Sequence, residues 1–125
     1  MKVLITGATG LIGSQIVKDC TKSNIKVNFL STSKTKIIRS NLVNGYYWNP
    51  KKNIIDLDCF NNIDSIISLS GTSIFKLWTT RNRKEIINSR VESLSFLRQC
   101  IIENKISVKN LVSASAIGIY PNSKE

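Results

Sequence analysis

The stretch Thr6-Gly7-Ala8-Thr9-Gly10-Leu11-Ile12-Gly13 decides how the N-terminal part of this chain is expected to fold. It follows a short apolar run, Val3-Leu4-Ile5, that is typical of a buried strand, and it leads into a helical pattern. Glycines at such a junction allow a sharp turn, close approach of a ligand to the backbone, and tight packing of helix on strand. Because the first helical turn offers unpaired N–H groups at a positive dipole end, we expect the loop to bind phosphate groups, through Gly7, Thr9, Gly10, Leu11, Ile12 and Gly13.

Strand-like and helix-like segments alternate along the chain. Further strands are predicted at Val27–Leu30, Gly45–Trp48, Ser65–Leu69 and Val108–Val112. Helices are predicted at Leu11–Lys22 and Thr79–Lys105, with a short helix possible in Thr32–Ser40. Their buried stripes are predicted to be Ile12, Ile16 and Cys20 in the first helix and Ile87, Val91, Leu94, Leu97 and Ile101 in the second.

This alternation predicts an α/β fold of the Rossmann type, a doubly wound parallel sheet with at least five strands. A complete dinucleotide-binding fold usually has six strands, for which 125 residues are few. We therefore expect residues 1–125 to form a dinucleotide-binding domain, truncated at its C-terminus, from a longer two-lobed protein.

The composition argues against several other classes of protein. The chain has 18 basic and 8 acidic residues, a net charge of +10, but the basic residues are scattered, so a nucleic-acid partner is not expected. Three widely spaced cysteines and the absence of a signal peptide or a long apolar segment indicate a reduced, cytoplasmic protein without a disulfide framework, a zinc site or a membrane partner. Without histidine, the chain contains no Ser-His-Asp triad and lacks the commonest metal ligand.

The glycine spacing GxxGxxG resembles the short-chain dehydrogenase/reductase superfamily, in its extended, epimerase-like branch. The similarity continues through Tyr47-Trp48-Asn49-Pro50, Ile63–Gly71, Asn88-Ser89-Arg90-Val91-Glu92 and Ser113–Tyr120. These motifs resemble the subgroup called epimerase family proteins. Members of that subgroup are considerably longer than this chain, so the resemblance implies that the chain corresponds to their N-terminal part. The resemblance implies a nicotinamide dinucleotide as cofactor.

The residues after the second strand bear on the choice between NADP and NAD. An acid about 20 residues past the glycine loop would accept from the ribose 2′-hydroxyl of NAD and repel a 2′-phosphate. The stretch Leu30–Lys36 contains no acid and offers hydroxyls and two lysines, which favours NADP, with NAD as the alternative. We expect Ser31, Thr32 and Lys34 to contribute. The subgroup commonly carries arginine at the position of Thr32, and for the lysines ordinary solvated charge is almost as good an interpretation.

The resemblance places further residues at the cofactor. Trp48 and Asn49 would lie near the adenine, although simple core packing explains Trp48 equally well. Leu69, Ser70 and Gly71, with Thr72 as a weaker candidate, would pass close to the pyrophosphate and the nicotinamide ribose. Arg90 would lie near the cofactor or a substrate anion, or would simply be an exposed helix arginine, which is the simpler interpretation.

Superfamily members carry out proton transfer with a Ser or Thr after the fifth strand and a YxxxK pair in the next helix. Ser115 matches the catalytic Ser position, with Ser113 as the runner-up. The sequence contains Tyr47–Lys51 and Tyr120–Lys124 at the YxxxK spacing, but each contains a proline that conflicts with a helical turn. We therefore expect the acid–base pair to lie beyond Glu125 and this chain alone to be inactive.

Two functions remain open at this point. The first is the NADP(H)-binding part of an epimerase-like oxidoreductase that acts on an unknown small molecule. The alternative is a non-catalytic dinucleotide-binding or sensor protein. Relatives in the extended branch often dimerise through the long helix, so a homodimer is possible.

Overall fold

The computed structural model describes residues 1–69 and 80–113, apart from the side chains of 80–87, 89 and 90. The described residues form a six-stranded sheet in the order β4-β3-β2-β1-β5-β6. All neighbouring strands are parallel except β3 and β4, which are antiparallel. The parallel, doubly wound sheet of at least five strands is thereby confirmed. Its strands are β1 (Lys2–Thr6), β2 (Lys26–Ser31), β3 (Val43–Asn49), β4 (Ile54–Ile55), β5 (Ser65–Ser68) and β6 (Asn110–Ser113).

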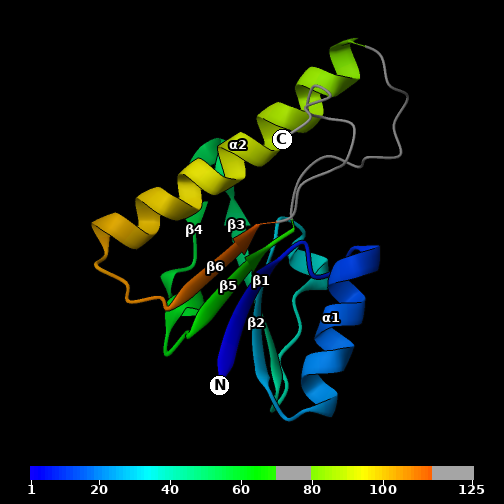
Figure 1. The fold of residues 1–125 in the computed structure, drawn as a ribbon, viewed down its shortest axis with the longest axis vertical. Helices are drawn as coiled ribbons and strands as arrows, with labels where there is room; N and C mark the ends of the chain where they lie inside the picture. Colours follow the sequence, from blue (N-terminus) through cyan, green and yellow to red (C-terminus); the bar gives the residue numbers. More distant parts are fainter. Residues whose placement is uncertain (70–79, 114–125) are drawn as a thin grey trace, which may run out of the picture.

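The two α-helices in the described part of the chain cover opposite faces of this sheet (Figure 1). Helix α1 (Leu11–Lys22) has the predicted bounds, and α2 (Thr80–Glu103) differs from its prediction by one or two residues at each end. Within the described ranges, no helix has both the length and the apolar character needed to cross a bilayer.

Helix α1 packs on β1 and β2 through a stripe that begins one residue later than predicted. Ile16, Val17 and Cys20 lie against a cluster formed by Val3, Ile5, Ala8, Val27 and Phe29. The prediction for Ile12 is wrong: its side chain is 64% exposed, whereas Gly13 beside it is buried. The helix approaches the sheet so closely at Gly13 that only a glycine fits, which leaves the neighbouring Ile12 directed away from the sheet.

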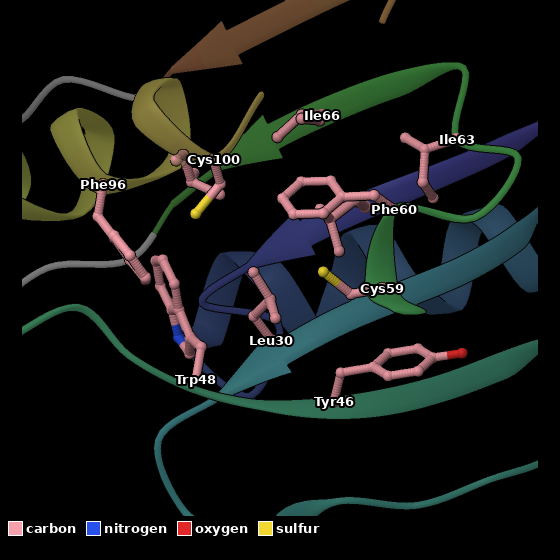
Figure 2. Close-up of a cluster of buried hydrophobic side chains, with 11 residues drawn as sticks. Leu30, Tyr46, Trp48, Cys59, Phe60, Ile63, Ile66, Phe96 and Cys100 are labelled. Atoms are coloured by element: carbon pink, nitrogen blue, oxygen red, sulfur yellow. The ribbon is translucent and has the colours of Figure 1, made fainter. Parts of the chain in front are cut away.

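Helix α2 packs on the other face, over the cluster shown in Figure 2. Among its described side chains, the buried ones are Ser93, Phe96, Leu97 and Cys100, at spacings of three, one and three residues. The prediction for Val91 is wrong, because this side chain is 57% exposed. The buried stripe is rotated toward Phe96, whose ring stacks on Trp48 of β3 with 6.3 Å between centroids and 21° between planes.

One polar side chain lies inside this apolar cluster. Asn28 of β2 is fully buried, and its Nδ2 donates to the Cys59 carbonyl oxygen at 2.9 Å. Its Oδ1 is buried without a hydrogen-bond partner among the described residues. The amide therefore fixes the segment around Cys59 to the sheet while leaving one acceptor unsatisfied.

Three short 3₁₀ helices occur among the described residues: η1 (Lys34–Lys36), η2 (Pro50–Lys52) and η3 (Leu57–Phe60). The first, η1, lies within Thr32–Ser40, where a short helix was predicted. The other two lie between β3 and β5, and the hydrophobic pattern did not predict them. Asn53, in the left-handed region at φ 55°, turns the chain after η2 so that β4 pairs back on Trp48 and Asn49. This turn places η2 at the carboxyl end of β3, in contact with α2.

Candidate functional site

A cavity of about 440 Å³ opens at the carboxyl ends of β1, β2, β3 and β5. In open α/β sheets, ligands bind at this edge, outside the carboxyl ends of the parallel strands. The lining residues come from five separate parts of the chain: Gly7, Thr9, Gly10, Leu30, Ser31, Thr32, Ser33, Lys36, Trp48, Asn49, Pro50, Lys51, Leu69, Glu92 and Ser93.

The glycine loop forms the wall of the cavity above β1. Gly7 has φ 77°, a conformation that L side chains rarely adopt, and its carbonyl oxygen accepts from the Gly10 N–H at 3.1 Å. Gly10 is the N-cap of α1 and carries no side-chain cap. The first N–H groups of α1 therefore remain available beside the cavity, which is the arrangement that binds phosphate at helix N-termini.

The residues of the loop differ in their position at the cavity. Gly7, Thr9 and Gly10 line it, and Gly13 supports it from behind by allowing α1 to approach Gly7 and Ala8. The side chains of Leu11 and Ile12 are exposed and do not line it. Any contact of these two residues with a ligand is therefore expected through their backbone N–H groups.

The turn after β2 forms the second wall. The Ser31 hydroxyl accepts from the Ser33 N–H at 3.1 Å and donates to the Ser33 carbonyl oxygen at 3.2 Å, so it holds the turn in shape. Thr32, Ser33 and Lys36 line the cavity beside it. Lys34 does not: its Nζ lies 5.0 Å from the centroid of the Tyr47 ring, in a cation–π contact. Of the two lysines in this turn, it is therefore Lys36 that lines the cavity, and not Lys34, which was expected to contribute.

Trp48 serves the core and the cavity together. The indole is only 2% exposed because it packs on Phe96 (Figure 2). The residue nevertheless lines the cavity, together with Asn49. Core packing therefore accounts for the burial of Trp48, and its place near the adenine stays a prediction. Pro50 and Lys51 of η2 also line this wall, and the sequence did not single them out as site residues, since the turn that directs them inward depends on β4.

The end of β5 is tied to β1 by the buried hydroxyl of Thr6. Its Oγ1 donates to Ser68 Oγ at 3.3 Å and accepts from the Leu69 N–H at 3.1 Å. Leu69 lines the cavity. The predictions for Ser70, Gly71 and Thr72, for the catalytic Ser115 and for the side chain of Arg90 fall outside the described residues, and Ser113 is the exposed last residue of β6.

Helix α2 supplies a fifth wall through Glu92 and Ser93, which sequence reasoning missed as site residues. Ser93 is buried and Glu92 is half-buried. The sequence signal for these site residues was that Glu92 and Ser93 are polar and stand one helical turn before the buried Phe96 and Leu97. The predicted stripe through Val91 obscured it, because that stripe directed Glu92 toward solvent.

The three thiols belong to the core rather than to the cavity. Cys59 and Cys100 belong to the cluster between α2 and the sheet, and Cys20 packs against the cluster between α1 and the sheet. Burial, with the nearby carboxylate of Asp56 as a second cause, raises the pKa of Cys59 well above its ordinary value. The pKa values of Cys20 and Cys100 are raised for the same first reason, so we expect all three thiols to be mainly protonated at neutral pH. The two buried thiols, Cys59 and Cys100, should in addition be protected from reagents in the folded chain.

These features define a Rossmann-type domain with a cavity at the carboxyl ends of its parallel strands. The sequence model of the "NAD dependent epimerase/dehydratase family" matches residues 3–125, and the chain belongs to this family. The resemblance to epimerase family proteins is confirmed by curated relatives of that name. One from Staphylococcus aureus is 33% identical over 118 residues, and YfhF of Bacillus subtilis is 30% identical over 125 residues. The matches cover 94% and 100% of this chain but only 38% and 41% of those proteins.

Solved structures share the fold. The human epimerase family protein SDR39U1, solved with NADPH, is 20% identical with a TM-score of 0.67, over 98% of this chain and 39% of that one. The UDP-glucose 4-epimerase of Bifidobacterium longum, solved with NAD⁺ and UDP, is 18% identical with a TM-score of 0.76, over 100% of this chain and 40% of that one.

Proposed function

We propose that this chain is the NADP(H)-binding part of an epimerase-like oxidoreductase that acts on a small molecule. The observation that carries the proposal is the cavity itself: a glycine loop at a helix N-terminus faces a turn after β2 that contains hydroxyls and a lysine but no acid. The human relative was solved with NADPH and the Bifidobacterium relative with NAD⁺, which supports a nicotinamide dinucleotide.

Two walls of the cavity bind the phosphate groups in this proposal. The N–H groups of the glycine loop and of the first turn of α1 bind the pyrophosphate. Thr32, Ser33 and Lys36 bind the 2′-phosphate of the adenosine ribose, in a turn that Ser31 stabilises. The nicotinamide supplies hydride transfer when bound. Ser115 is proposed to hold a proton at its hydroxyl beside that ring.

Titration with NADPH and NADH, followed by nicotinamide fluorescence, tests the proposal. We expect both to bind and NADPH to bind more tightly. Because Lys36 is exposed, we expect its contact with the phosphate to contribute about 1 kcal/mol, so Lys36→Ala should raise the Kd for NADPH about fivefold. The Kd for NADH should change little. The full chain failing to bind either dinucleotide would overturn the proposal.

Lys34→Ala is the matched control. It removes the same charge from the same turn, but Lys34 lies on the Tyr47 ring and does not line the cavity. We expect it to change the Kd for NADPH less than Lys36→Ala does. An equal effect of both variants would mean that the turn attracts the ligand by its overall charge and contains no defined phosphate contact.

A further inference from the structure

We infer that the Glu92 carboxylate recognises the purine of the dinucleotide by accepting a hydrogen bond from the exocyclic amino group of adenine. The inference rests on the proposed function, because it assigns a residue in the same cavity. It concerns the wall formed by α2 and η2.

The position of Glu92 follows from the packing of α2. Phe96, one helical turn later, stacks on Trp48, and α2 also contacts η2. Helical side chains lean toward the helix N-terminus, so Glu92 leans away from the Trp48–Phe96 pair and toward the open part of the cavity. It therefore lines the cavity together with Asn49 and Pro50 at the end of β3.

The strand order determines which half of the ligand reaches this wall. The glycine loop above β1 takes the phosphates, β2 and β3 lie on one side of it, and β5 lies on the other. With the ribose phosphate at the turn after β2, the base extends over the end of β3. The base then lies between η2 and α2, where the lining residues are Trp48, Asn49, Pro50, Lys51, Glu92 and Ser93.

The charge of Glu92 restricts the groups that it can contact. It is the one acid among the described residues that line the cavity, and within the described chain no donor or cation reaches its carboxylate. The phosphates of the ligand repel it, so its partner must be an uncharged donor. In the proposed function the adenosine ribose is bound on the opposite side of the cavity, at the turn after β2. The donors that remain for the Glu92 carboxylate are the two N–H groups of the adenine amino group.

A purine with a carbonyl oxygen at this position would face the carboxylate without a hydrogen bond. The wall would then discriminate between bases as well as bind one, because an unpaired acceptor opposite a carboxylate is unfavourable. Hypoxanthine differs from adenine at the amino group in this way, and its nicotinamide dinucleotide phosphate is therefore a suitable probe.

The test compares the Kd values of NADPH and the reduced hypoxanthine analogue for the full chain, measured by nicotinamide fluorescence. A hydrogen bond to a charged group corresponds to about a tenfold preference for adenine in the unmodified chain. Glu92→Ala should remove most of this preference. Glu92→Gln should reduce or reverse it, because an amide can donate to the carbonyl oxygen of hypoxanthine as readily as it accepts from adenine.

Glu103→Gln is the control, since it removes the same charge from the exposed end of the same helix, where the Glu103 side chain is hydrogen-bonded by Gln99. It should leave both Kd values unchanged. If the Glu92 variants change both Kd values by the same factor, the carboxylate acts only through its charge and the inference is overturned while the proposed function stands. If the unmodified chain binds neither dinucleotide, both fall.

Discussion

Replacing Gly13 by alanine should destabilise the chain through the contact between α1 and the glycine loop. A Cβ at this position would overlap the Gly7 carbonyl oxygen and lie 2.8 Å from both the Gly7 carbonyl carbon and Ala8 Cα. All three atoms belong to the backbone and cannot rotate away. Since carbon atoms pack at about 3.5–4.0 Å, helix and loop would have to separate by about 1 Å.

The size of the effect follows from two opposing contributions. Overpacking of this kind costs about 3 kcal/mol when the obstructing atoms cannot move, and alanine regains about 1 kcal/mol because it forms helix better than glycine. We therefore expect a net loss of about 2 kcal/mol in the free energy of unfolding. For a chain of this size, such a loss lowers Tm by about 8 °C.

Thermal melts followed by circular dichroism measure this difference, with Gly10→Ala as the matched variant. A Cβ at Gly10 would lie 3.4 Å from the Gly7 carbonyl oxygen, an ordinary contact, so the loss there should be about 1 kcal/mol or less, from the N-cap position alone. If Gly13→Ala melts within 2 °C of the unmodified chain, the close contact between α1 and the loop does not determine the stability of this region.

Two further predictions concern the core. Asn28→Asp should lower the free energy of unfolding, measured in urea, by about 3 kcal/mol. The variant loses the donor to the Cys59 carbonyl oxygen and buries a carboxyl group without a cation. An unchanged midpoint of the urea unfolding curve would contradict this prediction. With a thiol reagent at pH 7, Cys20 should react first, because its side chain is partly exposed. Cys59 should react only in urea, because burial excludes the reagent and raises the pKa of this thiol, which keeps it protonated. Raising the pH should speed modification of Cys20, whose raised pKa leaves little thiolate at pH 7, and mass spectrometry identifies the modified residue.

Much of the fold followed from local patterns. The bounds of α1 were predicted correctly because Gly10 and Ser23 flank a regular helical pattern. Strand β4 was missed because two residues, Ile54 and Ile55, are too few to show an alternation. Its antiparallel pairing depends on Asn53, whose left-handed conformation the sequence permits but does not require.

The candidate site was predictable where it is formed by local sequence and unpredictable where it depends on packing. Gly7 and Gly10 could be assigned because a strand–turn–helix junction needs glycines at these places. The choice between Lys34 and Lys36 depends on Tyr47, which lies on β3, outside the turn that contains both lysines. The rotation of α2 that directs Glu92 to the cavity depends on the packing of Phe96 against Trp48. The contact of Lys34 with Tyr47 and that of Phe96 with Trp48 both join separate parts of the chain, so neither produces a periodic pattern in the sequence.

β1 is a central strand of the described sheet. This strand has hydrogen-bonded neighbours on both sides, β2 and β5, whereas β4 and β6 are the outermost strands of the described sheet. Amide protons in such a central strand exchange with solvent mainly when the whole domain unfolds, while outer strands open locally at lower free energy. We therefore expect the amides of β1, which carries the glycine loop, to exchange more slowly than those of β4, which follows η2. In that case the phosphate-binding wall of the cavity would keep its shape during local opening of the outer strand.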